Sequence, residues 1–323
     1  MFCNFAQLEN LKHLSALYAD YLVKNKFTGN PETLYEPMNY IMGLGGKRVR
    51  PLLALLGAEA CGGDAKDALL WGHLVEVFHN FTLVHDDIMD NASTRRGMAT
   101  VHEKWGIAEG ILSGDNMLIA VYEGLLNSGY AHKMELLQLL SKTAREVCEG
   151  QQMDMDSATK NNITEADYLE MIRLKTAVLL GCSLQGGGIC AGADSKVQKL
   201  LYDFAINMGL CFQLNDDWLD AFGDPAQTGK VAGGDIAEGK KTWLYIHGNP
   251  QGATEDLWSR HSGTDRVNPT LLLWCEMELD KKLKAKADTF HEKSMEDLQA
   301  LDDLGVQTGA LRGLAQWLNQ RAH

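Results

Sequence analysis

The amino-acid sequence predicts an all-α protein, and three observations support this prediction. Proline occurs only six times in 323 residues, long stretches repeat apolar residues with the 3.6-residue period of a helix, and the alternation of a half-buried strand is hard to find. Hydrophobic residues make up 45% and charged residues 23% of the chain, which excludes disorder and collagen-like structure. We expect about ten or more helices in one large bundle, a single domain spanning residues 1–323.

Two long helices are predicted from the spacing of their apolar residues. The first lies around residues 70–88 and the second around residues 200–214, and in each the apolar residues recur every three or four positions. The first face consists of Leu70, Leu74, Val77, Phe78, Phe81, Val84 and Ile88, and the second of Leu200, Leu201, Phe204, Met208, Cys211 and Leu214.

Capping residues mark two further helix starts. Thr164 followed by Asp167 predicts a capping box that opens a helix running to about Leu180. Asn268 and Pro269 predict an N-cap and a first-turn proline ahead of another apolar helix.

Two stretches interrupt the helical pattern. Residues 223–241 are rich in Gly, Lys and Asp, which is typical of a working loop. Residues 247–267 are polar and aperiodic, and they indicate a plain surface connection or a partly disordered one.

Charge and composition exclude several kinds of partner and location. A net charge of −13 and a pI near 5.2 give the chain no general attraction for nucleic acid or anionic lipid. No run of eighteen apolar residues predicts an integral membrane segment, and the start does not have the pattern of a signal peptide. The seven cysteines are scattered and never in CxxC spacing, so we expect free thiols in a reducing cytoplasm.

Two aspartate-rich segments are the candidate metal sites. The segment HDDIMD places Asp86 and Asp90 four residues apart on one helix face, and the segment QLNDDWLD repeats the pattern with Asp216 and Asp220. Carboxylates at this spacing repel one another unless a cation lies between them, and hard divalent cations such as Mg²⁺ prefer oxygen ligands. One such pair alone is typical of a solvated acidic face, but two copies at the ends of apolar helices favour metal binding.

Glycine-flanked basic clusters accompany these carboxylates. They are GGKRVRP at residues 45–51, RRG at residues 95–97, and the lysines at 230, 240 and 241, which follow glycines in the predicted loop. Glycines that admit close backbone approach beside Lys and Arg suit phosphate binding, although each cluster alone is compatible with a surface turn. Lys175, inside the apolar segment LKTAVLLG, requires an anionic partner. The sequence therefore predicts a metal-assisted site for diphosphate esters.

The ordered motifs GGKRVRP, DDIMD with TRRG, LKTA, FQLNDDWLD and GKVAGGDIAEGKKTWL resemble those of the trans-isoprenyl diphosphate synthases, in the farnesyl and geranylgeranyl branch. The resemblance spans residues 45–244. It implies the isoprenoid synthase fold, with mostly antiparallel helices around a deep central cavity, and a homodimer. It also implies that the enzyme joins isopentenyl diphosphate to an allylic diphosphate (dimethylallyl, geranyl or farnesyl).

The same resemblance assigns roles to individual residues. It implies a cluster of about three Mg²⁺ ions per site, with Mn²⁺ also suitable. The metal ligands implied are Asp86, Asp90 and Asp216, with Asp87, Asp217 and Asp220 on the same acidic rims. Ligands implied for the allylic diphosphate are Arg95, Lys175, Lys230 and Lys240, and for isopentenyl diphosphate Lys47, Arg50, His79 and Arg96. Thr176 and Gln213 are implied to flank the reacting carbons.

The resemblance also implies that product length depends on the residues just before the first carboxylate motif. Phe81 lies five residues and Thr82 four residues before Asp86, and in the family aromatic residues there imply fifteen carbons and small ones longer products. One of each favours a fifteen- or twenty-carbon product, with twenty slightly preferred. Two alternatives stay open, a terpene cyclase and a regulatory subunit on the same fold. The basic clusters argue against the first, and the intact motifs argue against the second.

Overall fold

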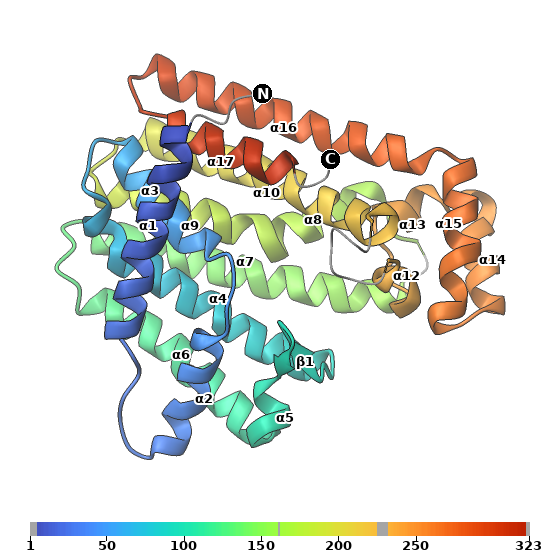
Figure 1. Ribbon diagram of the computed structural model, residues 1–323, viewed down its shortest axis with the longest axis horizontal. Coiled ribbons are helices and arrows are strands. Elements are labelled where there is room, and N and C mark those ends of the chain that lie inside the picture. The colour runs from blue at the N-terminus through green and yellow to red at the C-terminus, as the bar shows by residue number, and fades with distance from the viewer. Residues whose placement is uncertain (1–4, 161, 225–231, 321–323) are drawn as a thin grey trace. The chain divides into compact units, whose positions relative to one another are not determined.

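The structure, a computed structural model, describes residues 5–160, 162–224 and 232–320. This part of the chain is built almost entirely of helices, so the predicted all-α fold is confirmed (Figure 1). It falls into two compact units. The first holds the described residues of Met1–Ser141, Cys182–Leu201 and Leu304–Ala310, and the second those of Lys142–Gly181, Tyr202–Asp303 and Leu311–His323. The single domain stays a prediction.

The first unit contains the N-terminal helices and one short antiparallel hairpin. Its elements are α1 (Phe5–Lys24), α2 (Glu32–Gly43), α3 (Val49–Ala60), a 3₁₀ turn η1 (Ala65–Ala68), α4 (Leu69–Met89), β1 (Thr94–Arg95), β2 (Met98–Ala99), α5 (Val101–Trp105) and α6 (Ile107–Leu126). The start of α7 (Lys133–Thr159), the end of α9 (Val178–Cys190) and the start of α10 (Ser195–Phe222) also belong to it.

Helix α4 forms the buried centre of the first unit and carries the first predicted apolar face. Leu74, Val77 and Phe78 of that face are buried, and α6 lies alongside the helix (Figure 1). The close approach depends on Gly114 of α6, because a Cβ at this position would lie 2.3 Å from Nε2 of His85. That Nε2 lies 3.2 Å from the carbonyl oxygen of Ile111. A carbonyl oxygen only accepts, so Nε2 carries the proton, and His85 binds the neighbouring helix.

The second unit contains the remainder of the helices. Its elements, besides parts of α7, α9 and α10, are α8 (Glu165–Ile172), a π-helical turn η2 (Arg173–Ala177), α12 (Gly234–Glu238), α13 (Trp243–His247), 3₁₀ turns η3 (Pro250–Gly252) and η4 (Gly263–Arg266), α14 (Ala253–Arg260), α15 (Val267–Glu276), α16 (Leu279–Asp303) and α17 (Gly309–Gln320), whose first two residues lie in the first unit. Its core includes Trp243, Trp258 and Trp274.

The capping box at the start of α8 is confirmed, but the predicted end of that helix is wrong. Thr164 accepts a hydrogen bond from the backbone of Asp167, and Asp167 accepts one from the backbone of Thr164. The helical path continues past Leu180 through η2 and α9 to Cys190. Gly181 does not end the helix because it packs. A Cβ there would lie 2.7 Å from the ring of Tyr202 on α10.

The interpretation of residues 247–267 as a surface connection is also wrong. They include α14, and the Trp258 indole donates to Thr270 Oγ1 at 2.9 Å while the Trp274 indole donates to Thr254 Oγ1 at 3.1 Å. Trp258 anchors a polar helix of only eight residues, which is too short for a helical period to be recognised from the sequence.

The start of α15 also differs from the prediction. The helix begins at Val267, so Asn268 and Pro269 lie inside its first turn and do not cap it. The proline is tolerated because first-turn N–H groups have no acceptor within the helix. Among the described residues, no helix has both the length and the hydropathy needed to cross a membrane.

Candidate active site

The first carboxylate motif lies at the C-terminal end of α4, and its three aspartates have different surroundings. Asp86 is half-buried and Asp90 is exposed, whereas Asp87 is only 1% exposed. Arg95 of β1 donates to Asp87 through Nε at 2.8 and 2.9 Å and through Nη2 at 2.6 Å. The metal role predicted for Asp87 stays a prediction, but its carboxylate forms a bidentate ion pair that fixes the guanidinium of Arg95.

A cluster of cationic side chains lies in the same unit. Burial first, and then the charges of Arg50, Arg96, Arg95 and Arg48, hold the pKa of His79 well below 6.5, so its imidazole is neutral at pH 7. Burial lowers the pKa of Arg50 to about 10, and its Nε has no hydrogen-bond partner among the described residues. An unpartnered buried guanidinium N–H is a donor to which an anion could bind.

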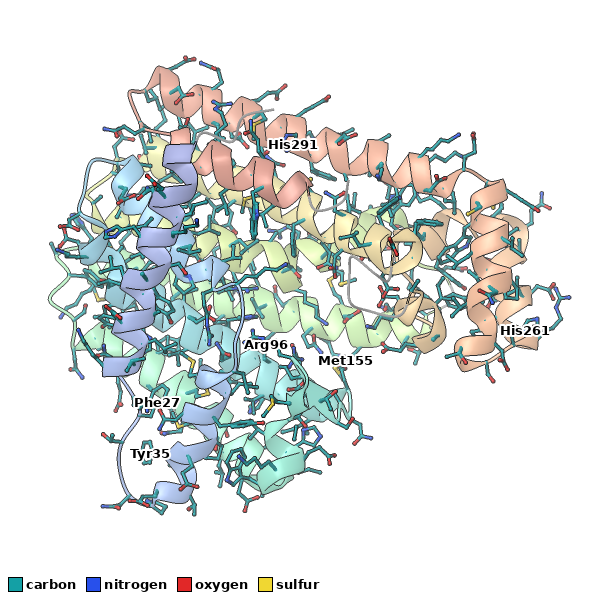
Figure 2. All side chains as sticks on the ribbon, viewed as in Figure 1. Phe27, Tyr35, Arg96, Met155, His261 and His291 are labelled. Atoms are coloured by element: carbon teal, nitrogen blue, oxygen red, sulfur yellow. The ribbon has the colours of Figure 1, made fainter. Side chains whose placement is uncertain are left out.

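Arg96, which is labelled in Figure 2, lies close to the loop that carries Lys47. Its Nη1 donates to the carbonyl of Leu44 at 3.1 Å, and a Cβ on Gly46 would lie 2.9 Å from its Cζ. Lys47 itself is exposed. The structure thus brings Arg50, His79 and Arg96 together into one group, the basic cluster, and places Lys47 on the adjoining loop.

The two residues predicted to set product length lie on α4 within this unit. Phe81 is buried, and its ring meets those of Phe78 and His85 edge-on at centroid distances of 5.5 and 4.9 Å. Thr82 donates its hydroxyl to the carbonyl of His79 at 2.8 Å. The hydroxyl of Thr82 is therefore used inside the helix.

The second carboxylate motif lies in α10, in the second unit. Asp216 is exposed, whereas Asp217 is 4% exposed and accepts hydrogen bonds from the hydroxyl of Tyr168 and from Nε2 of Gln213. Burial raises the pKa values of both Asp217 and Tyr168. Only Asp216 of this adjacent pair presents its carboxylate to solvent.

Asp220 connects the second motif to the stretch predicted as a working loop, in which the structure forms the short helix α12. Its Oδ2 accepts from the backbone N–H of Asp235 at 2.9 Å, and its carbonyl accepts from Gly233 at 2.6 Å. Asp217, Asp220, Asp235 and Lys240 line one small cavity.

Lys240 binds carboxylates within this loop. Its Nζ lies 3.1 Å from Asp235 and 2.9 Å from Glu238. Burial alone would lower the pKa of Lys240, but these two carboxylates outweigh it and raise the pKa above 10.5. Lys230, the other lysine predicted here, lies outside the described residues.

The π-helical turn η2 presents Lys175 and Thr176. Lys175 forms an ion pair with Asp154 of α7, which is the anionic partner that the sequence requires. Oγ1 of Thr176 and Oε1 of Gln213 are 3.5 Å apart, so the two residues predicted to flank the reacting carbons are neighbours. π-Helical turns inside α-helices occur frequently at functional sites.

The predicted metal binding depends on carboxylates that reach solvent. Among the described residues no three His, Cys, Asp or Glu side chains gather around one point that could hold a metal ion. The carboxylate oxygens of Asp86 and Asp90 in the first unit, and of Asp216 in the second, suit a hard divalent cation. A cation bound at either motif would need further oxygen ligands, which a diphosphate offers.

The sequence did not identify the residues that hold these side chains in place. In the first unit Arg48 forms an ion pair with Glu76, and in the second unit Tyr168 donates to Asp217. The one signal available for Glu76 was an isolated acid inside an apolar helix, three residues before His79.

The chain is similar to several known proteins. The family model described as Polyprenyl synthetase matches residues 31–266. A geranylgeranyl diphosphate synthase of Methanosarcina mazei is 36% identical over 296 residues, covering 91% of each chain. A solved geranylgeranyl pyrophosphate synthase has a TM-score of 0.89 with 42% identity, covering 97% of this chain and 98% of that one. A solved polyprenyl synthase of Caulobacter crescentus, complexed with calcium and isoprenyl diphosphate, has a TM-score of 0.84 with 26% identity, covering 98% and 97%.

Proposed function

Because the chain belongs to the polyprenyl synthetase family, we propose that it condenses isopentenyl diphosphate with an allylic diphosphate, head to tail. The products are farnesyl or geranylgeranyl diphosphate and inorganic diphosphate. The observation that carries this proposal is the basic cluster of the first unit, in which Arg50 keeps an unpartnered buried N–H beside Arg96 and a neutral His79. A cyclase has no second diphosphate to hold and gives no reason for such a cluster.

In the proposed reaction the basic cluster holds isopentenyl diphosphate. Arg50 and Arg96 supply fixed charge, and His79, kept neutral by burial and by the charges of four nearby arginines, supplies a hydrogen bond without adding a charge. Lys47 on the adjoining loop completes the set. Such preorganised donors need no rearrangement when the double bond attacks.

The allylic diphosphate is held by a second group of residues in this proposal. The residues proposed for this role are Lys175, which is oriented by Asp154, Arg95, which is oriented by Asp87, and Lys230 and Lys240. Thr176 and Gln213 lie beside the reacting carbons. The apolar helices that carry these groups exclude water, which would otherwise capture the allylic cation.

We propose that Asp86 and Asp90 of the first unit and Asp216 and Asp220 of the second hold the divalent cations, Mg²⁺ by preference. Cations held by these residues would supply positive charge that offsets the negative charge developing on the departing diphosphate. Asp87 and Asp217 accept hydrogen bonds from Arg95 and Tyr168. We propose that each holds that partner in place, and the metal role that the resemblance implies for them stays a prediction.

A product-length assay tests the function. Purified protein is incubated with labelled isopentenyl diphosphate, Mg²⁺ and dimethylallyl, geranyl or farnesyl diphosphate, and the products are sized. We expect one product of fifteen or twenty carbons, which disappears with a chelator. Absence of extension from every primer by folded protein would overturn the proposal.

Phe81→Ala is expected to lengthen the product by about one or two isoprene units, because the buried ring would no longer block growth of the prenyl chain. The assay is the same sizing of products. Leu74→Ala, an equally buried change on the same helix, is the control for cavity formation and is expected to leave product length unchanged. If Phe81→Ala and the parent protein made products of equal length, a residue other than Phe81 would limit chain growth.

We propose that the chain acts as a homodimer through the outer face of α6. Besides its buried face, α6 exposes a set of large apolar side chains, which is unusual for a monomer. They are Ile107, Ile111, Leu112, Ile119 and Leu126.

The double variant with Leu112→Glu and Ile119→Glu is expected to sediment as a monomer, whereas the parent protein sediments as a dimer. Analytical ultracentrifugation measures both. Leu272→Glu, which changes an equally exposed leucine on α15, is the control and should leave the dimer intact. A parent protein that is monomeric throughout the working range would contradict the proposal.

We make two broader proposals, one about the domain and one about the location of the protein. Residues 1–323 act as one catalytic domain, because both compact units are assembled from separate stretches of sequence and neither is a contiguous module. The cysteines in the described part of the chain form no disulfide, and Cys182 and Cys211 are buried. This supports a place in the reducing cytoplasm.

A further inference from the structure

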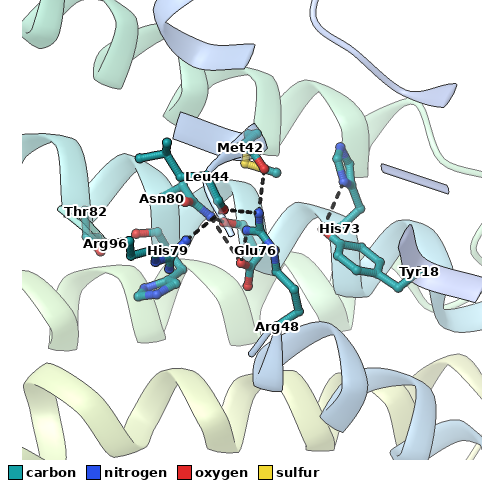
Figure 3. Close-up of polar contacts among 10 residues, drawn as sticks. All are labelled: Tyr18, Met42, Leu44, Arg48, His73, Glu76, His79, Asn80, Thr82 and Arg96. Atoms are coloured by element: carbon teal, nitrogen blue, oxygen red, sulfur yellow. Dashed lines mark hydrogen bonds and ion pairs between the residues drawn. The ribbon is translucent and has the colours of Figure 1, made fainter. Parts of the chain in front are cut away.

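Arg48 differs from the other cations of its segment in what its side chain binds. It is the residue before α3 and has left-handed backbone angles, φ 47° and ψ 42°. Its Nη1 donates to Oε1 of Glu76 at 2.6 Å, and its Nη2 donates to the carbonyls of Met42 at 2.5 Å and Leu44 at 2.7 Å (Figure 3). Both terminal nitrogens of this guanidinium are therefore used inside the protein.

The partner carboxylate is buried and held on its other side. The side chains of Arg48 and Glu76 are 13% and 3% exposed. Asn80, one turn further along α4 and fully buried, donates to the carbonyl of Glu76 at 2.7 Å and to its Oε1 at 3.3 Å. Glu76 is thus a fixed anchor on the central helix of the first unit.

The carbonyls that Arg48 binds lie where α2 ends. Met42 is in the last turn of α2, and Leu44 is its C-cap, so their carbonyls belong to the set that a helix leaves without partners. A cation that binds them stabilises the negative end of the helix. Arg48 therefore joins the end of α2, the start of α3 and the middle of α4.

This junction also reaches the basic cluster. The carbonyl of Leu44 accepts from Arg96 as well as from Arg48, and the residues between Leu44 and Arg48 are Gly45, Gly46 and Lys47. Two glycines have no side chains with which to fix a loop, so its path depends on its two ends. Arg48 binds one end and forms the other.

We propose that Arg48 and Glu76 are a positioning pair that sets the loop of Lys47 and the guanidinium of Arg96 for binding isopentenyl diphosphate. Arg48 does not bind the substrate itself. The inference rests on the proposed function, and it distinguishes cations that the sequence presents as alike. Lys47 and Arg50 bind the ligand, whereas Arg48 fixes the loop between α2 and α3.

The test compares two variants that treat the pair differently. The double variant with Arg48→Met and Glu76→Leu removes both charges together and leaves no carboxylate buried alone. Glu76→Gln keeps an oxygen that accepts from Arg48. For each we would measure kcat, the KM of both substrates and the thermal unfolding midpoint.

The double variant is expected to remain folded and to raise the KM of isopentenyl diphosphate at least about tenfold, with the KM of the allylic substrate and kcat within about twofold. Glu76→Gln is expected to keep that KM within about threefold of the parent value. If Arg48 bound the substrate, Glu76→Gln would instead lower the KM by freeing its charge, and that result would overturn the inference. So would an unchanged KM in the folded double variant.

Tyr18→Phe is the matched control, because it removes a buried hydrogen bond to α4, the helix that carries Glu76. The hydroxyl of Tyr18 lies 3.4 Å from Nδ1 of His73, which is three residues before Glu76 (Figure 3). It should lower the unfolding midpoint without changing either KM. If Tyr18→Phe raised the KM of isopentenyl diphosphate as much as the double variant, a general loss of packing would explain both, and the inference would fail.

A parent protein that extends no primer would count against the proposed function alone. Calorimetry with inorganic diphosphate then decides the inference. Binding by the parent that is lost in the folded double variant supports it, and binding retained by that variant overturns it.

Discussion

Asp86→Asn is expected to lower kcat about 10³-fold while leaving the fold intact. The half-buried carboxylate lies in the last turn of α4, and the amide keeps its shape but has no charge with which to bind a divalent cation. Losing one element of preorganised charge stabilisation costs about 10²–10³ in rate, and a lost cation belongs at the upper end of that range. Steady-state kinetics at several Mg²⁺ concentrations measures the effect.

Two further variants make this result specific. Asp20→Asn changes an exposed aspartate on α1 and should leave kcat unchanged. Asp87→Asn weakens the bond to Arg95, and it should reduce activity without raising the Mg²⁺ concentration that gives half-maximal rate. If Asp86→Asn retained more than about a tenth of the parent kcat at saturating Mg²⁺, this carboxylate would not be a metal ligand.

Gly187→Ala is expected to have the largest effect on stability, lowering the free energy of unfolding by at least about 3 kcal/mol. A Cβ at this position of α9 would lie 2.0 Å from the carbonyl oxygen of Ala54 on α3, and a Cβ on Gly57 of α3 would lie 2.3 Å from the carbonyl of Leu184. The contacts are with backbone, so neither helix can adjust by a change of rotamer. Urea denaturation followed by circular dichroism measures the loss.

The control for this prediction has the same chemical change in open space. Gly43 ends α2, and a Cβ there would have no neighbour within 4 Å. Alanine is the better helix former by about 1 kcal/mol, so Gly43→Ala should be neutral or slightly stabilising. Equal stabilities for Gly187→Ala and the parent protein would show that α3 and α9 do not pack backbone to backbone.

The prediction of a polyprenyl synthetase was correct because its signals are local. Each motif needs only a few residues in fixed order, and the comparisons confirm the family, the all-α fold and an enzyme that transfers prenyl groups. The helix faces around α4 and α10 and the capping box at Thr164 were read correctly for the same reason, since period and capping depend on neighbours within a few positions.

The errors concern segments whose conformation depends on distant partners. The helix through η2 and α9 continues past Gly181 because Tyr202 covers that glycine. Residues 253–260 form a helix because Trp258 finds Thr270. Neither partner lies within one turn of the residue it affects, so a pattern read along the chain could not reveal them.

The sequence by itself determined which residues carry charge and in what order, and that was enough for family, fold class and the kind of chemistry. Only the tertiary structure decided how each charge is used. Asp86 and Asp87 are adjacent, yet one is half-exposed and the other is buried against Arg95. Lys47 and Arg48 are adjacent, yet one is exposed and the other is bonded to Glu76. Burial and pairing are properties of what packs around a side chain, and packing is set by residues far along the chain.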